Sequence, residues 1–161
     1  MDIDWKRLIE LRERHEKTAQ QRVAQQRDAV QSRQQQADAA QQQWQQQVHS
    51  RSAHWQGTTS AMAGGSFNAG QLRDAAAGSR ALDVQIQRAG QQVNQAQQAL
   101  VQSHGELEAQ RGQLRAVSGE LRRAQQMLQR ARAAAQRLEA RRQEAEADEL
   151  ATRKWQRRGG S

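Results

Sequence analysis

The residue types that most often carry chemistry are few in this chain and poorly spaced for it. The sequence has four histidines and no cysteine, which excludes thiolate nucleophiles, disulfides and thiolate metal sites. No two histidines stand four residues apart, the spacing that presents two metal ligands on one helix face. Gly64-Gly65-Ser66 lacks the lysine and the spacing of a phosphate-binding loop. We therefore expect solvated histidines, no metal, no cofactor and no enzymatic activity.

Charge is the second feature that could carry function. The formal net charge is +8, which favours partners with an acidic surface. From about residue 122 the chain is dense in Arg and Lys, but acidic residues interleave with them and no aromatic residues are spaced along the segment to stack on bases. The pattern disfavours nucleic acid and leaves two interpretations, a solvated helix flank or docking into an acidic protein groove. Trp155 is the candidate anchor, because Trp and Arg concentrate binding energy at interfaces.

Composition indicates which elements position these residues. The chain has no proline, only 35% hydrophobic residues, and many Gln, Arg, Ala, Glu and Leu, which are good helix formers. A thick core is unavailable, so burial must follow a narrow stripe. The charged N-terminal residues and the lack of a long apolar run predict a protein without membrane insertion, and the lack of cysteine is compatible with an intracellular compartment.

An apolar position recurs every three and then four residues through both halves of the chain, a spacing typical of coiled coils. The pattern predicts an all-α fold in which two long helices pair along this seam. The residues predicted to form the seam are Trp5, Ile9, Val23, Val30, Trp44, Leu82, Ile86, Val93, Leu100, Leu107, Leu114, Val117 and Leu121.

Breaks in the pattern predict a single antiparallel hairpin. We expect helix one at about 3–56, a Gly-, Ser- and Thr-rich linker at 57–70, and a longer helix two at about 71–157. Asp2 and Asp4 could cap the first helix, and Asn68 with Gln71 resembles a capping box before the second. Whether the hairpin closes within one chain or between two is left open.

Matching apolar residues across the hairpin predicts a register. The facing pairs then include Trp5 with Leu121, Arg12 with Leu114, Gln26 with Leu100 and Trp44 with Leu82. Helix two would extend beyond helix one by about 35 residues, or roughly 50 Å. A partner protein, a second copy or fraying could each account for the unpaired stripe. The predicted partner-binding residues of this overhang are Leu128, Ala131, Ala135, Leu138, Arg141, Arg142, Arg153, Lys154 and Trp155.

Two further patterns have more than one interpretation. Trp44, Trp55 and Phe67 flank the bend, where they either pack the hairpin tip or form a second partner surface. Gly105, Gly112 and Gly119 repeat every seven residues, which indicates a bend, a close approach of another surface, or chance.

The opening segment WKRLIELRER at 5–14, the Gln/Arg/Ala-rich helices and the closing segment DELATRKW at 148–155 resemble the FliJ/YscO stalk proteins of flagellar and type III secretion systems. In its high content of Gln, Ala and Arg, the chain is most similar to the Hrp-type members of the family from plant-associated bacteria. The likeness spans nearly the whole chain and is one of length, helix layout and composition.

This resemblance implies a virulence-associated bacterial protein at the cytoplasmic base of the secretion apparatus. Its paired termini would enter the pore of a hexameric export ATPase, and the rest would contact the cytoplasmic domain of the export gate or secretion chaperones. The family has no catalytic residues. Two alternatives stay open, a homo-oligomeric structural coiled coil and, less favoured by the charges, a basic nucleic-acid-binding protein.

Overall fold

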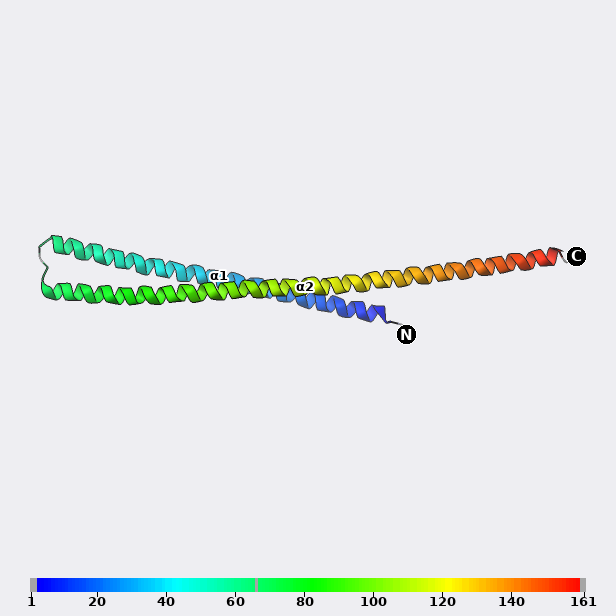
Figure 1. The fold of residues 1–161 in the computed structure, drawn as a ribbon, viewed down its shortest axis with the longest axis horizontal. Helices are drawn as coiled ribbons and strands as arrows, with labels where there is room; N and C mark the ends of the chain where they lie inside the picture. Colours follow the sequence, from blue (N-terminus) through cyan, green and yellow to red (C-terminus); the bar gives the residue numbers. More distant parts are fainter. Residues whose placement is uncertain (1–2, 66, 160–161) are drawn as a thin grey trace. The chain divides into compact units, whose positions relative to one another are not determined.

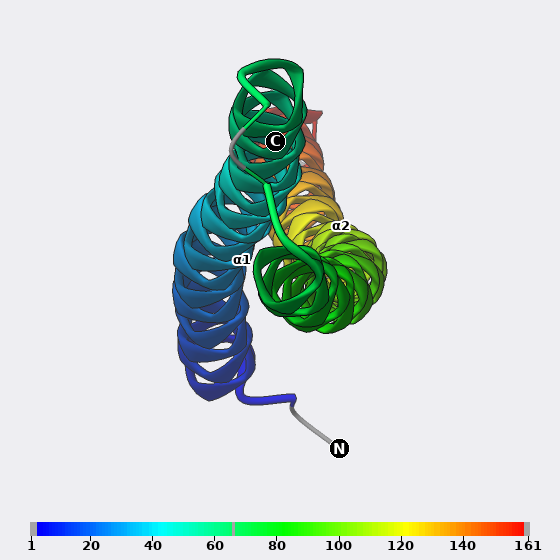
Figure 2. The same ribbon diagram turned by 90° about the vertical axis from the view of Figure 1, so that its left-hand side faces the viewer.

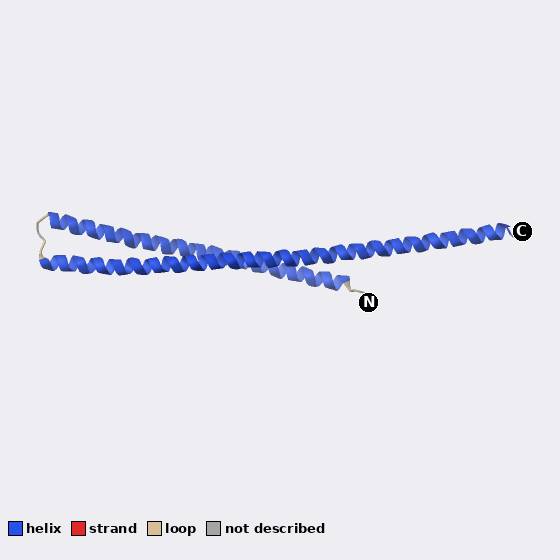
Figure 3. Ribbon diagram, in the orientation of Figure 1, coloured by secondary structure: helices blue, strands red, loops and turns tan. Residues whose placement is uncertain are grey.

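The structure, a computed structural model, describes residues 3–65 and 67–159, and all regular structure in that part of the chain is helical (Figures 1 and 3). Helix α1 spans Trp5–Ala63 and helix α2 spans Ala69–Gly159. The predicted all-α antiparallel hairpin, with a longer second helix, is confirmed. Contacts divide the chain into two units, each with a segment of both helices. We name residues 21–112 the hairpin unit, and residues 1–20 with 113–161 the terminal unit.

Side chains cap the N-terminus of each helix as the sequence predicts. The backbone N–H of Arg7 donates to Asp4 Oδ1 at 3.1 Å. At the start of α2, the Gln71 N–H donates to Asn68 Oδ1 at 2.8 Å, and the Asn68 N–H donates to Gln71 Oε1 at 3.1 Å. These bonds satisfy N–H groups that have no partner within the helix. Asp2 lies outside the described residues.

The predicted linker at 57–70 is wrong, because α1 continues to Ala63 and α2 begins at Ala69. The Thr58 and Thr59 hydroxyls donate to backbone carbonyls one turn back, at 2.9 and 2.7 Å, so these residues are accommodated within the helix. Among the described residues of the turn, Gly65 has a left-handed backbone, with a φ of 74°. Helix α2 also extends to Gly159, beyond the predicted end at about 157.

In the hairpin unit α1 and α2 lie beside each other along the predicted seam, seen from the loop end in Figure 2. Val23, Ala37, Ala89 and Leu107 are buried. The seam continues past Trp44, because Thr58 and Ser79 are also buried. The other predicted seam residues of this unit are half-buried, namely Val30, Trp44, Leu82, Ile86, Val93 and Leu100.

In the terminal unit α1 and α2 also pair along the seam, over a shorter length of helix. Ala19, Leu121 and Ala124 are buried, and Leu128 is half-buried. The remaining predicted seam residues of this unit are half-buried, namely Trp5, Ile9, Leu114 and Val117.

The register of the hairpin unit differs from the predicted one. The Gln26 side-chain amide donates to the Ser103 carbonyl at 3.0 Å and to the Ser103 hydroxyl at 3.1 Å. Trp44 Nε1 lies 3.7 Å from the position that a Cβ on Gly90 would occupy, so Trp44 is level with Gly90 and not with Leu82. Both partners stand later in α2 than predicted.

The terminal unit shows the same displacement, since Arg12 forms an ion pair with Glu120 and not a layer with Leu114. The same residues of each helix still face the other helix. Because the seam repeats every seven residues, this is possible only if α2 is shifted relative to α1 by about one heptad. The cause is the turn. Because α1 continues through 57–63, the chain reverses later than predicted, and the position of the turn sets the register of antiparallel helices.

Gly105 is helical and has no neighbour within 4 Å of the position where a Cβ would lie. We expect Gly105→Ala to raise the free energy of unfolding by about 1 kcal/mol through helix propensity alone. Thermal unfolding followed by far-UV circular dichroism would measure this. Gly65→Ala is the matched control and should destabilise, because its φ is positive. A loss of stability in Gly105→Ala would instead indicate that another surface approaches closely there.

Candidate partner-binding surface

The largest unpaired surface of the terminal unit belongs to α2 beyond the start of α1. Leu8, near that start, lines a groove of about 270 Å³ with Ala124 and Met127. Past Leu128 the described residues of α2 are exposed except for Ala133, which is half-buried, and every described residue from 134 to 159 is exposed. We name residues 129–159 the overhang. Its length is about 45 Å at the rise of an α-helix.

The structure places eight of the nine predicted partner-binding residues on this exposed helix. Leu128 is the exception, because the one-heptad change of register brings it into the paired part of the terminal unit, where it is half-buried. The predicted overhang was therefore too long at its N-terminal end. The exposed residues are Ala131, Ala135, Leu138, Arg141, Arg142, Arg153, Lys154 and Trp155.

An apolar stripe runs from the groove along the overhang. Its members are separated by three, four or seven residues, so they lie on one face of the helix. Met127 and Leu138, the large residues of the stripe, are each about half exposed. Met127 and Ala134 were not predicted, because the seam that packs against α1 uses the neighbouring helix positions. Their spacing in the sequence was the available signal. The stripe consists of Met127, Ala131, Ala134, Leu138 and Ala145.

The end of the overhang combines an indole with a basic helix terminus. Trp155 is 74% exposed. Arg153 Nη2 lies 2.9 Å from Glu149 Oε1 one turn earlier, so this guanidinium is already engaged within the helix. Arg157 stands in the last turn, where a cation is favoured by the helix dipole. Such an end can bury a flat aromatic ring and present positive charge to a partner.

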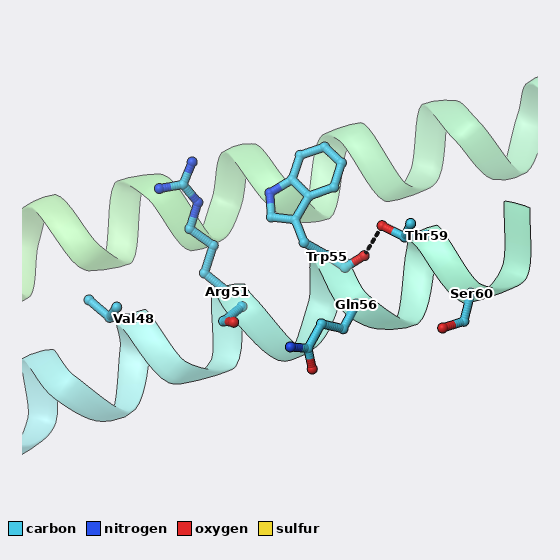
Figure 4. A pocket seen from close by; sticks show the side chains of 7 residues that line it. Val48, Arg51, Trp55, Gln56, Thr59 and Ser60 are labelled. Carbon is cyan, nitrogen blue, oxygen red and sulfur yellow. Dashed lines mark hydrogen bonds between the residues drawn. The ribbon is translucent and has the colours of Figure 1, made fainter. Parts of the chain in front are cut away.

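The hairpin unit carries a second exposed surface on α1 (Figure 4). A shallow groove of about 750 Å³ is lined by Val48, Arg51, Trp55 and Thr59, among others. Arg51 Nε pairs with an Asp83 carboxylate oxygen on α2 at 3.0 Å, and the Thr59 hydroxyl donates to the Trp55 carbonyl. Two polar groups of the groove are therefore already engaged, and the half-exposed indole of Trp55 remains available.

The aromatic residues near the bend divide between the two predicted roles. Trp44 is half-buried and packs beside Gly90 of α2, which is the first of the two predicted roles. Trp55 is about half exposed, at 48%, and lies seven residues from exposed Val48 and Met62, so the three share one face of α1. Phe67 is half-buried.

The histidines do not form a site. His15, His49 and His104 are exposed, as expected. His54 was wrongly expected to be solvated, because it is half-buried and its Nε2 donates to the Ala75 carbonyl of α2 at 3.0 Å. The described residues contain no group of His, Asp or Glu side chains that could hold a metal ion.

In residues 3–65 and 67–159, neither helix has a stretch apolar enough to cross a membrane. No family model, curated protein or solved structure matches this chain. The exposed overhang and the residues along it are therefore the features of the chain that bear on its function.

Proposed function

We propose that this protein is a non-enzymatic stalk and adaptor of a bacterial type III secretion export apparatus. In this proposal the overhang inserts into the central opening of a hexameric export ATPase, at the cytoplasmic base of the apparatus. The observation that supports it most is the overhang itself. A single helix that is exposed on all sides from 134 to 159, over about 40 Å, and is apolar along one stripe has a form that a ring could surround.

Three properties of the overhang fit this role. Its backbone groups are satisfied within the helix, so the helix can enter a narrow opening without exposing unpaired polar groups. Leu138 and Trp155 offer large apolar side chains to the lining of the ring. The basic residues at the end of the overhang, within 153–158, suit an acidic lining and would raise the association rate by steering.

The hairpin unit has its own part in this proposal. The exposed surface of Val48, Trp55 and Met62 would contact the cytoplasmic domain of the export gate or a secretion chaperone. No catalytic step is assigned to the chain, so its contribution to export is binding and positioning.

The test is a double variant, Leu138→Asp with Trp155→Ala, added to the cognate export ATPase. Truncating one interface anchor commonly costs about 2 kcal/mol, so we expect binding at least about thirtyfold weaker and loss of ATPase stimulation and ring assembly. Both residues are exposed, so thermal unfolding should be unchanged.

Val101→Asp is the matched control. Val101 is 71% exposed and lies in the hairpin unit, outside the overhang, so this variant should stimulate the ATPase like the wild type. Unchanged stimulation by the double variant would contradict the proposal. Binding to random duplex DNA with a steep dependence on salt would support a nucleic-acid-binding function instead.

A further inference from the structure

One face of the overhang carries charged side chains of both signs in a regular order. Its residues are separated alternately by four and three positions, so they lie on one side of α2, within an arc of about 100°. This side is opposite to the seam with α1, which uses Leu121, Ala124 and Leu128. Every residue of the face is exposed. We name it the mixed face, and it consists of Arg130, Ala134, Arg137, Arg141, Glu144, Asp148, Ala151 and Trp155.

The order of residues along the mixed face is complementary to itself. The arginines stand in its first half, and the carboxylates and the indole stand in its second half. Residues at equal distances from the point between Arg142 and Gln143 form matched pairs. These pairs are Arg141 with Glu144, Arg137 with Asp148, Ala134 with Ala151, and Arg130 with Trp155. A copy of the face that runs in the opposite direction therefore presents a complementary residue at each level.

The helix itself leaves the charges of the mixed face without partners. Within residues 3–65 and 67–159, the charged side chains of this face form no ion pair and no hydrogen bond. Arg137 and Arg141 stand four residues apart, as do Glu144 and Asp148. Like charges at this spacing are unfavourable within one helix. A second helix with the reverse order of charges would relieve both repulsions.

We propose that the mixed face binds the same face of a second copy of this chain, antiparallel, about a twofold axis between Arg142 and Gln143. Arg137 of one copy then faces Asp148 of the other, and Arg141 faces Glu144. Because of the symmetry, each of these ion pairs forms twice. A parallel pair in register would place every charge opposite its own copy, which is unfavourable.

The uncharged residues of the mixed face fit the same arrangement. Ala134 faces Ala151 of the other copy, and these small side chains allow the two helix axes to approach closely. At each end Trp155 faces Arg130, and an indole and a guanidinium attract each other when the cation lies over the ring. Trp155 is the most exposed large apolar residue of the overhang, at 74%, and this contact would cover it.

The second copy does not compete with α1 for space on α2. Helix α1 covers the opposite side of α2 as far as Leu128, whereas the overlap of the two copies begins at Arg130 and ends at Trp155. The overlap is about 38 Å long. A two-helix contact of this size, held by exposed ion pairs, should give a weak dimer with a dissociation constant of about 10–100 µM.

This pairing is argued from the order and the exposure of the mixed face and does not depend on the proposed function. Trp155 contributes to both. If the overhang also enters a ring, pairing and entry therefore exclude each other.

The first experiment is sedimentation velocity on the full chain in about 150 mM salt, without any ATPase. One variant carries Arg137→Glu with Arg141→Glu, and the other carries Glu144→Arg with Asp148→Arg. Each variant alone places like charges at every facing pair, so its self-association should be at least about thirtyfold weaker than that of the wild type. A mixture of the two variants has opposite charges at every facing pair and should form a heterodimer about as tight as the wild-type dimer.

Arg132→Glu with Arg142→Glu is the matched control. It changes the net charge by the same amount within the same length of α2, but on the side that faces away from the second copy. This variant should dimerise like the wild type. A loss equal to that of Arg137→Glu with Arg141→Glu would overturn the proposal, because net charge and not the mixed face would then determine the association.

The second experiment tests the register by disulfide cross-linking. The chain has no cysteine, so single cysteines can be introduced at Ala134→Cys and at Ala151→Cys. Mixed and treated with oxidised glutathione, the two variants should cross-link to each other, because these positions face each other. Neither variant should cross-link to itself, because its two cysteines would lie about 25 Å apart along the axis, beyond the reach of a disulfide.

Three further results would overturn the proposal. They are a wild type that stays monomeric at about 200 µM in about 50 mM salt, a mixture of the charge-reversed variants that does not associate, and cross-linking within each single-cysteine variant in place of cross-linking between them. No ATPase is present in these experiments, so their failure would leave the proposed function unaffected.

Discussion

Replacing Leu107 by Asp is expected to lower the free energy of unfolding by about 3 kcal/mol, the largest effect of any single change in the seam. Leu107 is only 5% exposed and is among the most buried large side chains of the hairpin unit. The substitution removes an apolar side chain from the interface between α1 and α2 and leaves a charge there without a partner. The midpoint of thermal unfolding, followed by circular dichroism, should fall by about 10 °C.

Val101→Asp is the control for this prediction. Val101 stands six residues earlier on the same helix and is 71% exposed, so the same charge should change the midpoint very little. Equal losses from the two variants would mean that helix propensity, and not the pairing of α1 with α2, determines the stability of this segment.

Replacing Ala89 by Leu is expected to destabilise the hairpin unit by about 2 kcal/mol. Ala89 is 3% exposed and precedes Gly90, beside which the Trp44 indole lies. The two helices approach closely at this level because the residues of α2 are small, and a larger side chain must push them apart. Chemical denaturation, with the midpoint compared at constant slope, would measure the loss.

Ala81→Leu is the matched change at an exposed position of the same helix. Alanine and leucine have similar helix propensities, so this variant should unfold like the wild type. If Ala89→Leu were as stable as Ala81→Leu, the close pairing at Trp44 and Gly90 would be contradicted.

The seam could be read from the sequence because each half of the chain carries it independently. The spacing from Ile9 to Trp44 and from Leu82 to Leu121 identifies which face of each helix is buried, and the structure buries or half-buries those faces. The caps at Asp4 and Asn68 were also predictable, since each depends on residues three apart in the sequence.

The register could not be read in the same way. Shifting the two helices by one heptad leaves seam residues opposite seam residues, so apolar matching alone does not separate the two alignments. The turn decides between them, and its position depends on whether 57–63 stays helical. Composition at Gly57, Thr58 and Thr59 suggests a break, whereas the hydroxyl bonds to the preceding turn show how these residues are held in the helix.

The wrong register misplaced only the N-terminal end of the predicted overhang. Leu128 was assigned to the overhang because the predicted turn was too early. The positions from Leu138 to Trp155 are far enough beyond α1 that either register leaves them exposed. Met127 and Ala134 were missed because α2 carries two adjacent apolar faces. The regular spacing of the seam that packs against α1 conceals the spacing of the exposed stripe beside it.

The bond from Gln26 to Ser103 has a mechanical meaning for the hairpin unit. Two helices with a uniformly apolar contact can shift along each other in steps of seven residues at little cost in free energy. The buried Ser103 opposes such a shift, because moving the helices would break both hydrogen bonds that the Gln26 side chain donates to it. An axial push on one helix of this unit is therefore passed to the other and not lost as slippage.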